Sequence, residues 1–189
     1  SRKQDNGTSA GTHLITMLGA YVILPILLAM PFAHLVKSIT FFQAYFEMLS
    51  SLTTTGATLF DDPKSISEPL HLWRALVGWL GGFMILVVAM AIFAPLNMGG
   101  FEIYALQRHR KAALSQIQKA EVTDRINKFA GQIFPVYLLL TTVLSLVLIV
   151  LGERSLVAVS HAMAVLSTSG ISPVGGLSGA QGGMMVEAV

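Results

Sequence analysis

Two short segments of this chain place a run of hydroxyl side chains immediately before a glycine. The members of these segments are Thr53, Thr54, Thr55, Gly56 and Ala57 in the first, and Ser167, Thr168, Ser169, Gly170 and Ile171 in the second. Glycine reaches backbone conformations that other residues adopt only at a cost, which allows successive carbonyl groups to face one axis. Carbonyl groups arranged in this way replace the hydration shell of a cation without adding net charge. We therefore predict that both segments line a selectivity filter for a monovalent cation.

The repetition of the segment is more informative than either copy alone. A single Thr-Thr-Thr-Gly run fits many turns, because hydroxyl residues and glycine are common there. Here Thr168 takes the place of Thr54 and Gly170 takes the place of Gly56. The same order recurring after a similar apolar stretch indicates an internal duplication. Each copy has one glycine where the potassium-channel filter TVGYG has two, so we expect milder discrimination between K⁺ and Na⁺.

An apolar stretch too short to cross a bilayer precedes each filter, at 40–52 and 155–166. Thr40 and Gln43 have the Thr-x-x-Gln spacing of a capping box, which predicts that the first of these helices begins there. A helix of this length covers about 18 Å, little more than half of the hydrocarbon core. We expect both to be half-helices that enter the membrane partway and turn back. If they enter from outside, their C-terminal ends favour a cation near the membrane centre.

The composition indicates that these half-helices lie among membrane-spanning helices. Apolar residues make up 53% of the 189 residues and charged residues 12%, whereas a soluble domain carries roughly 25% charged residues. Long uncharged segments predict spans at 13–36, 73–95 and 132–151. The fold class we expect is an all-α membrane protein, in contact with lipid, built from repeated span, half-helix, filter and span units. The absence of cysteine from the sequence excludes disulfides and thiolate metal sites.

These elements divide the chain into four parts. We predict a poorly ordered polar tail at 1–12, a first pore repeat at 13–101, a basic connection at 102–128 and an incomplete second pore repeat at 129–189. The second repeat lacks its closing span, so we expect the chain to be a fragment. The connection holds six of the twelve Lys and Arg residues, which predicts a cytoplasmic location by the positive-inside rule. The filters would then open to the outside.

Several individual residues have competing interpretations. We interpret Gly81 and Gly82 as helix-packing residues rather than pore residues, and Arg74 as an interfacial anchor rather than a substrate ligand. Glu47 lies inside the first half-helix, where a charge is costly. Two roles stay open for it: attracting cations, or serving as a satisfied structural partner behind the filter. His161 aligns with Glu47, and we interpret it as a packing or hydrogen-bonding residue.

Longer phrases of the sequence resemble a known family. MPFAHLVKSITFFQAYFEMLSSLTTTGATLF followed by LHLWRALVGWLGG, and later SHAMAVLSTSGIS, are similar to the TrkH-type membrane subunits of the Trk/Ktr/HKT potassium transporter superfamily. The resemblance covers nearly the whole chain beyond residue 13. In that family four repeats in one polypeptide surround one pore, and this chain holds about one and a half of them. Family features of later repeats therefore cannot be placed on this sequence.

The resemblance implies potassium uptake across a bacterial inner membrane. It implies K⁺ as the transported ion, a homodimer and a cytosolic nucleotide-binding regulatory subunit, with no cofactor and no nucleic-acid partner. No enzyme motif such as GxSxG, HExxH or a phosphate-binding Gly-Lys-Ser/Thr occurs in the sequence. Two alternatives stay open at this point. One is a less selective K⁺/Na⁺ transporter working by alternating access. The other is a non-conducting membrane scaffold whose connection at 102–128 recruits a cytosolic regulator.

Overall fold

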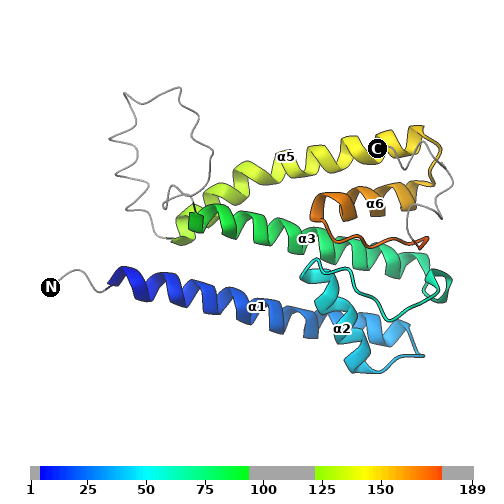
Figure 1. Cartoon of the computed structure of the whole chain (residues 1–189), viewed down its shortest axis with the longest axis horizontal. Helices are drawn as coiled ribbons and strands as arrows, with labels where there is room; N and C mark the ends of the chain where they lie inside the picture. Colours follow the sequence, from blue (N-terminus) through cyan, green and yellow to red (C-terminus); the bar gives the residue numbers. More distant parts are fainter. Residues whose placement is uncertain (1–4, 94–121, 176–189) are drawn as a thin grey trace.

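The computed structural model describes residues 5–93 and 122–175, and within these ranges it consists of helices and connecting loops without strands (Figure 1). The elements are α1 (Asp5–Leu35), α2 (Phe41–Leu52), the 3-10 helix η1 (Pro63–Ser65), α3 (Glu68–Phe93), α5 (Val122–Val150) and α6 (Ser155–Ser167). Three helices contain stretches long and apolar enough to cross a membrane: Ile15–Leu35, Glu68–Ala91 and Asp124–Val150. The expected fold class, an all-α membrane protein, is confirmed.

Two helices begin earlier in the chain than the hydropathy pattern predicted. Helix α1 begins at Asp5, so residues 5–12 of the predicted polar tail lie in its first turns. Helix α5 begins at Val122, so the end of the predicted connection at 102–128 is helical. Once a helix is nucleated, each added residue gains a hydrogen bond, and it continues past the apolar stretch until something stops it. The rest of that connection, and the part of the second repeat after residue 175, lie outside the described residues.

The two short helices begin at the same end of the bundle and run back toward the middle of α3 (Figure 1). Thr40 caps α2 through the predicted capping box: its hydroxyl accepts from the Gln43 N–H, and the Gln43 side chain accepts from the Thr40 N–H. Helix α2 has 12 residues and α6 has 13, which corresponds to about 18–20 Å at the usual helical rise. Neither helix is long enough to cross a hydrocarbon core of about 30 Å.

Helix α3 lies between the two halves of the molecule (Figure 1). On one side, α1, α2 and α3 share an apolar core that includes Phe32, Met48 and Val77. On the other side, Leu148 of α5 packs against Ala158 and Ala162 of α6. Each half-helix is therefore held by the span that precedes it, and both meet α3.

Three glycines on one face of α3 allow both half-helices to approach its backbone. A Cβ built on Gly81 would overlap the carbonyl oxygen of Leu52 at the end of α2. A Cβ on Gly82 would lie 2.8 Å from the Cβ of Ser167 at the end of α6, closer than real Cβ contacts. Gly78 is less restricted, and its Cβ would lie 3.3 Å from the carbonyl oxygen of Ser51. These contacts support the packing interpretation of Gly81 and Gly82, because larger residues would push the half-helix ends away.

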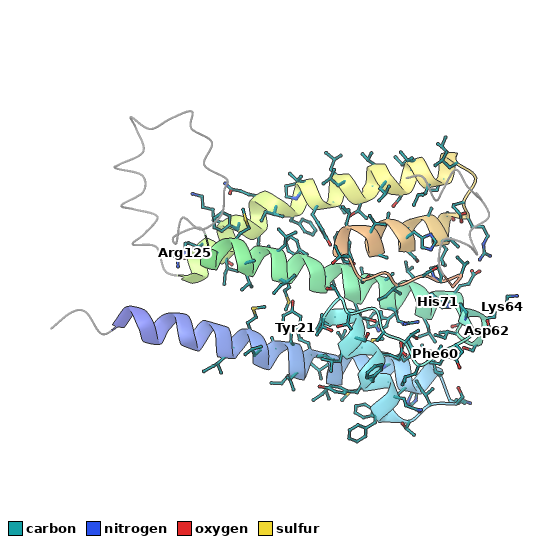
Figure 2. The ribbon with its side chains drawn as sticks, in the orientation of Figure 1. Tyr21, Phe60, Asp62, Lys64, His71 and Arg125 are labelled. Atoms are coloured by element: carbon teal, nitrogen blue, oxygen red, sulfur yellow. The ribbon has the colours of Figure 1, made fainter. Side chains whose placement is uncertain are left out.

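Charged and polar side chains lie at the two ends of the bundle, and apolar side chains cover the length between them. Figure 2 shows Asp62, Lys64 and His71 together at the end where α3 begins, and Arg125 at the opposite end, near the start of α5. The outward faces of α1 and α5 carry exposed large apolar side chains, among them Ile15, Leu18, Leu139 and Val150. An apolar girdle between two polar ends is the arrangement expected for helices surrounded by lipid.

Candidate functional site

Both predicted filters lie in loops that leave the half-helices beside the middle of α3 and return toward its N-terminal end (Figure 1). Their backbones adopt the same unusual conformation at matching positions. Thr54 and Thr168 each have a φ of 56°, and Gly56 and Gly170 have φ of 74° and 65°. A positive φ is rare for a β-branched residue such as threonine, and strained backbone of this kind clusters at functional sites. The two loops therefore share one backbone geometry, in which Thr54 and Thr168 take the left-handed position that follows many helix ends.

The hydrogen bonds that begin each filter also match. In both loops two consecutive N–H groups donate to carbonyl groups in the last turn of the half-helix, over 2.9 to 3.1 Å. The matching donor and acceptor pairs are Thr54 with Ser51 and Thr168 with Val165, then Thr55 with Ser50 and Ser169 with Ala164. Because these N–H groups are bound behind the filter, the backbone is fixed where it turns away from the helix end.

Hydroxyl groups form a second matching set. The hydroxyls of Thr53 and Thr55 are hydrogen-bonded to one another at 2.9 Å, and those of Ser167 and Ser169 at 3.0 Å. These side chains thus satisfy one another within each filter. The hydroxyl-rich composition recognised in the sequence corresponds to this internal pairing, which the sequence did not reveal.

The two filters lie directly against each other. A Cβ built on Gly56 would overlap the carbonyl oxygen of Ser169, so the first filter touches the backbone of the second at its glycine. In the second filter Ser167, Ser169 and Ile171 are buried, whereas Thr168 and Gly170 are exposed. In the first filter the side chains are more open. Its exposed members are Thr53, Thr55 and Ala57, and its half-buried members are Thr54 and Gly56.

One predicted filter residue has its carbonyl group directed elsewhere. The Ser50 hydroxyl donates a hydrogen bond of 2.7 Å to the Ala57 carbonyl oxygen, which ties the end of the first filter back to α2. In the second repeat the corresponding positions are Ala164 and Ile171, and alanine has no hydroxyl to make this bond. The side chain of Ile171 instead reaches α3, with its Cδ1 atom 3.4 Å from a Cβ built on Gly78.

A buried ion pair behind the first filter was not predicted from the sequence. Arg74 of α3 donates to the carboxylate of Glu47 at 2.9 Å, and the Glu47 side chain is 0% exposed. The interpretation of Arg74 as an interfacial anchor is wrong, because this residue is 4% exposed and points into the protein. Of the two roles left open for Glu47, the structure shows the satisfied partner. The signal that could have suggested the pair was the presence of two charges within apolar segments, where an ion needs a counter-ion.

His161 occupies the place of Glu47 in the second repeat. It is 5% exposed, and its Nε2 atom is hydrogen-bonded to the Ser172 hydroxyl at 2.9 Å, as expected for a hydrogen-bonding histidine. Burial lowers the pKa of His161 from its usual value, and the carboxylate of Glu153 partly opposes this shift. The imidazole is therefore neutral at pH 7, so the second filter has no buried charge at this position.

A cavity of about 310 Å³ opens where the C-terminal ends of both filters meet. Gly56 and Thr58 line it from the first loop, and Gly170 and Ser172 line it from the second. Asp61, His71 and Arg74 are also among its lining residues. Residues from two distant parts of the sequence therefore border one space next to the predicted ion ligands.

Comparisons of the sequence with known proteins identify a family for this chain. The family model described as "TrkH: Cation transport protein" matches residues 21–182. The Trk system potassium uptake protein TrkH of Escherichia coli K12 is 30% identical over 83% of this chain and 30% of its own length. Trk system potassium uptake protein TrkI of Halomonas elongata is 29% identical over 82% of this chain and 29% of its own length.

The chain thus spans about 30% of the length of these curated relatives. No solved structure gave a significant match. The family match extends from α1, through both half-helices and both filters, past the last described residue. On this evidence of sequence, the chain belongs to the TrkH family of cation transport proteins.

Proposed function

We propose that the full-length protein carries out potassium uptake, and that this chain supplies two of the filter segments that surround the ion. The observation that carries the proposal is the matched backbone of the two loops, with positive φ at Thr54 and Thr168 and at Gly56 and Gly170. The contact between Gly56 and the Ser169 carbonyl supports a shared ion path, because it brings both filters to one place. The curated relatives are described as potassium uptake proteins.

In this proposal the backbone carbonyl groups of 53–56 and 167–170 replace water around a dehydrated K⁺. The hydroxyl groups within each filter keep the loops in place through their mutual hydrogen bonds. The half-helices contribute an electrostatic field that attracts cations, since the C-terminal end of a helix carries a partial negative charge of about half an elementary charge. Both α2 and α6 end beside α3, next to the start of the filters, so both fields favour a cation there. Two filter segments cannot enclose an ion alone, so the remaining ligands come from further filter segments of the full-length protein or from associated chains.

The polar ends of the bundle support the orientation that we propose. The filters return toward the end that holds Asp62 and Lys64, and Arg125 lies at the other end (Figure 2). We place the filters toward the outside of a bacterial inner membrane and the connection at 102–128 in the cytoplasm, in agreement with the positive-inside rule. A homodimer and a cytosolic nucleotide-binding regulatory subunit complete the proposed assembly, on the basis of the family resemblance.

The test is growth of a bacterium that lacks its own potassium uptake systems. We expect the full-length gene to restore growth on low K⁺, together with measurable K⁺ uptake. The same gene with residues 53–57 and 167–171 scrambled is the matched control, and it should fail although the protein reaches the membrane. If membrane-inserted wild-type protein restores neither growth nor K⁺ uptake, the proposal of potassium transport is wrong. Retained binding of a cytosolic partner without ion flux would favour the scaffold.

Electrical recording of the purified full-length protein separates the two transport mechanisms. A filter with a continuous ion path predicts unitary currents in a planar bilayer. Saturable turnover without unitary currents would instead indicate alternating access. The scrambled-filter protein provides the baseline for both measurements.

A further inference from the structure

The carboxylate of Glu47 joins three segments of the chain at one buried point. It sits on α2, accepts a hydrogen bond of 2.6 Å from the Leu59 N–H, and accepts another of 3.1 Å from the Thr58 hydroxyl. Its other oxygen forms an ion pair with the guanidinium group of Arg74 on α3, at 2.9 Å. One side chain therefore connects the half-helix, the stretch immediately after the first filter and the central span.

The ion pair determines what this carboxylate can do. Removing two charges from water costs several kcal/mol per ion unless each is paired and hydrogen-bonded. With Arg74 at 2.9 Å the pair is neutral overall, which argues against a role in attracting cations by net charge. The carboxylate therefore acts through its hydrogen bonds, which depend on direction. Hydrogen bonds to a charged acceptor are shorter and about twice as strong as neutral ones. These bonds hold the peptide group between Thr58 and Leu59.

That peptide group lies directly after the filter. Thr58 follows Ala57, whose own carbonyl group is held by Ser50 of the same half-helix at 2.7 Å. Two side chains of α2 therefore hold the outer end of the first filter, one at Ala57 and one at Thr58. A loop fixed at both ends keeps its carbonyl groups at a set distance from the ion, and in the snug-fit account of selectivity this distance contributes to which ion is preferred.

The second repeat makes the same connection without a charge. His161 replaces Glu47, Ser172 replaces Thr58, and the two side chains are hydrogen-bonded at 2.9 Å. The bond across the filter is thus present in both repeats, whereas the ion pair is confined to the first among the described residues. Both repeats therefore share a side-chain hydrogen bond from the half-helix to the residue after the filter. A charged group makes this bond in the first repeat only.

We infer that Glu47, oriented by Arg74, is a positioning residue that tethers the outer end of the first filter and thereby sets the preference for K⁺ over Na⁺. The inference rests on the proposed function and names the group that fixes the geometry of the filter. Glu47 touches no ion in this arrangement. Its effect passes through the backbone of Thr58 and Leu59.

Two double variants of the full-length protein test the tether separately from the ion pair. Both remove the two charges together, so neither leaves a buried charge without a partner. Glu47→Gln with Arg74→Met keeps a side-chain oxygen that can accept from Leu59 and Thr58. Glu47→Leu with Arg74→Met removes that acceptor. We expect the first double variant to retain most of the wild-type K⁺/Na⁺ uptake ratio. In the second double variant we expect this ratio to fall about fivefold or more, which corresponds to the free energy of about one hydrogen bond.

Membrane insertion and thermal unfolding in detergent serve as folding controls for both double variants. Equal, wild-type uptake ratios in both would overturn the inference while leaving potassium transport intact. If the Leu and Met combination does not fold, Thr58→Val provides the second measurement, because it removes one donor of the tether at an exposed residue. An unchanged ratio in folded Thr58→Val protein would also overturn it. If the wild-type protein moves no K⁺, the proposed function fails and this inference fails with it.

Discussion

Replacing Gly56 by serine in the full-length protein tests whether the two filters share one ion path. Gly56 has a φ of 74°, and a Cβ built there would overlap the carbonyl oxygen of Ser169. That oxygen belongs to the second filter, so a side chain in one filter must displace a predicted ion ligand in the other. We expect the preference for K⁺ over Na⁺ to fall, because a displaced carbonyl no longer replaces the hydration shell of K⁺.

The size of the effect can be estimated in two parts. A residue with a Cβ in the left-handed conformation costs about 1 to 2 kcal/mol, which is small against a typical unfolding free energy of about 5–15 kcal/mol. The overlap with the Ser169 carbonyl adds to this cost, so membrane insertion and thermal unfolding in detergent must first show that the variant folds. If moving one carbonyl costs bound K⁺ about 1.4 kcal/mol more than it costs Na⁺, the K⁺/Na⁺ ratio falls about tenfold. Uptake of both ions into proteoliposomes measures this ratio directly.

Gly152→Ser provides the matched control. Gly152 also has a positive φ, of 99°, but it lies in the turn between α5 and α6 with no described heavy atom within 4 Å of its Cβ position. The control thus carries similar backbone strain away from the filters. We expect reduced thermal stability with an unchanged ion preference. If Gly56→Ser and Gly152→Ser give the same K⁺/Na⁺ ratio as the wild type, the shared ion path is refuted.

Two further substitutions test the packing that positions the filters. Gly81→Ala should lower the yield of folded protein, because its Cβ overlaps the Leu52 carbonyl, whereas Gly19→Ala meets no described atom within 4 Å and should be neutral or slightly stabilising; expression and thermal unfolding in detergent compare the two. Trp79→Phe removes the 2.9 Å hydrogen bond to the Thr141 hydroxyl and should lower the unfolding free energy by about 1 kcal/mol, which a lowered melting temperature would show.

The sequence alone was sufficient for features that depend on local residue patterns. Uncharged stretches of about 20 residues predict spans wherever they occur, because the hydrocarbon core has a fixed thickness. The capping box at Thr40 marked the start of α2, since Thr40 and Gln43 bond to each other within one turn. The repeated order around Gly56 and Gly170 indicated two related loops, and both have positive φ at matching positions.

The limits of the helices were harder to predict. Helix α1 starts at Asp5 and α5 starts at Val122, both before the apolar stretches that the sequence marked. Hydropathy reports which residues suit lipid, whereas a helix can continue into water as long as its hydrogen bonds do. The sequence therefore located the spans more accurately than the ends of their helices.

Only the tertiary structure decided which groups meet across the repeats. The pairing of Arg74 with Glu47, the contact of Gly56 with the Ser169 carbonyl and the approach of Leu52 to Gly81 all join residues from different elements. A single sequence contains no record of such distances, so Arg74 was assigned to the membrane surface on the basis of its position at the start of a span. What settled its role is burial: a charge enclosed in an apolar bundle must find its counter-ion there, and the folded arrangement of α2 and α3 provides Glu47.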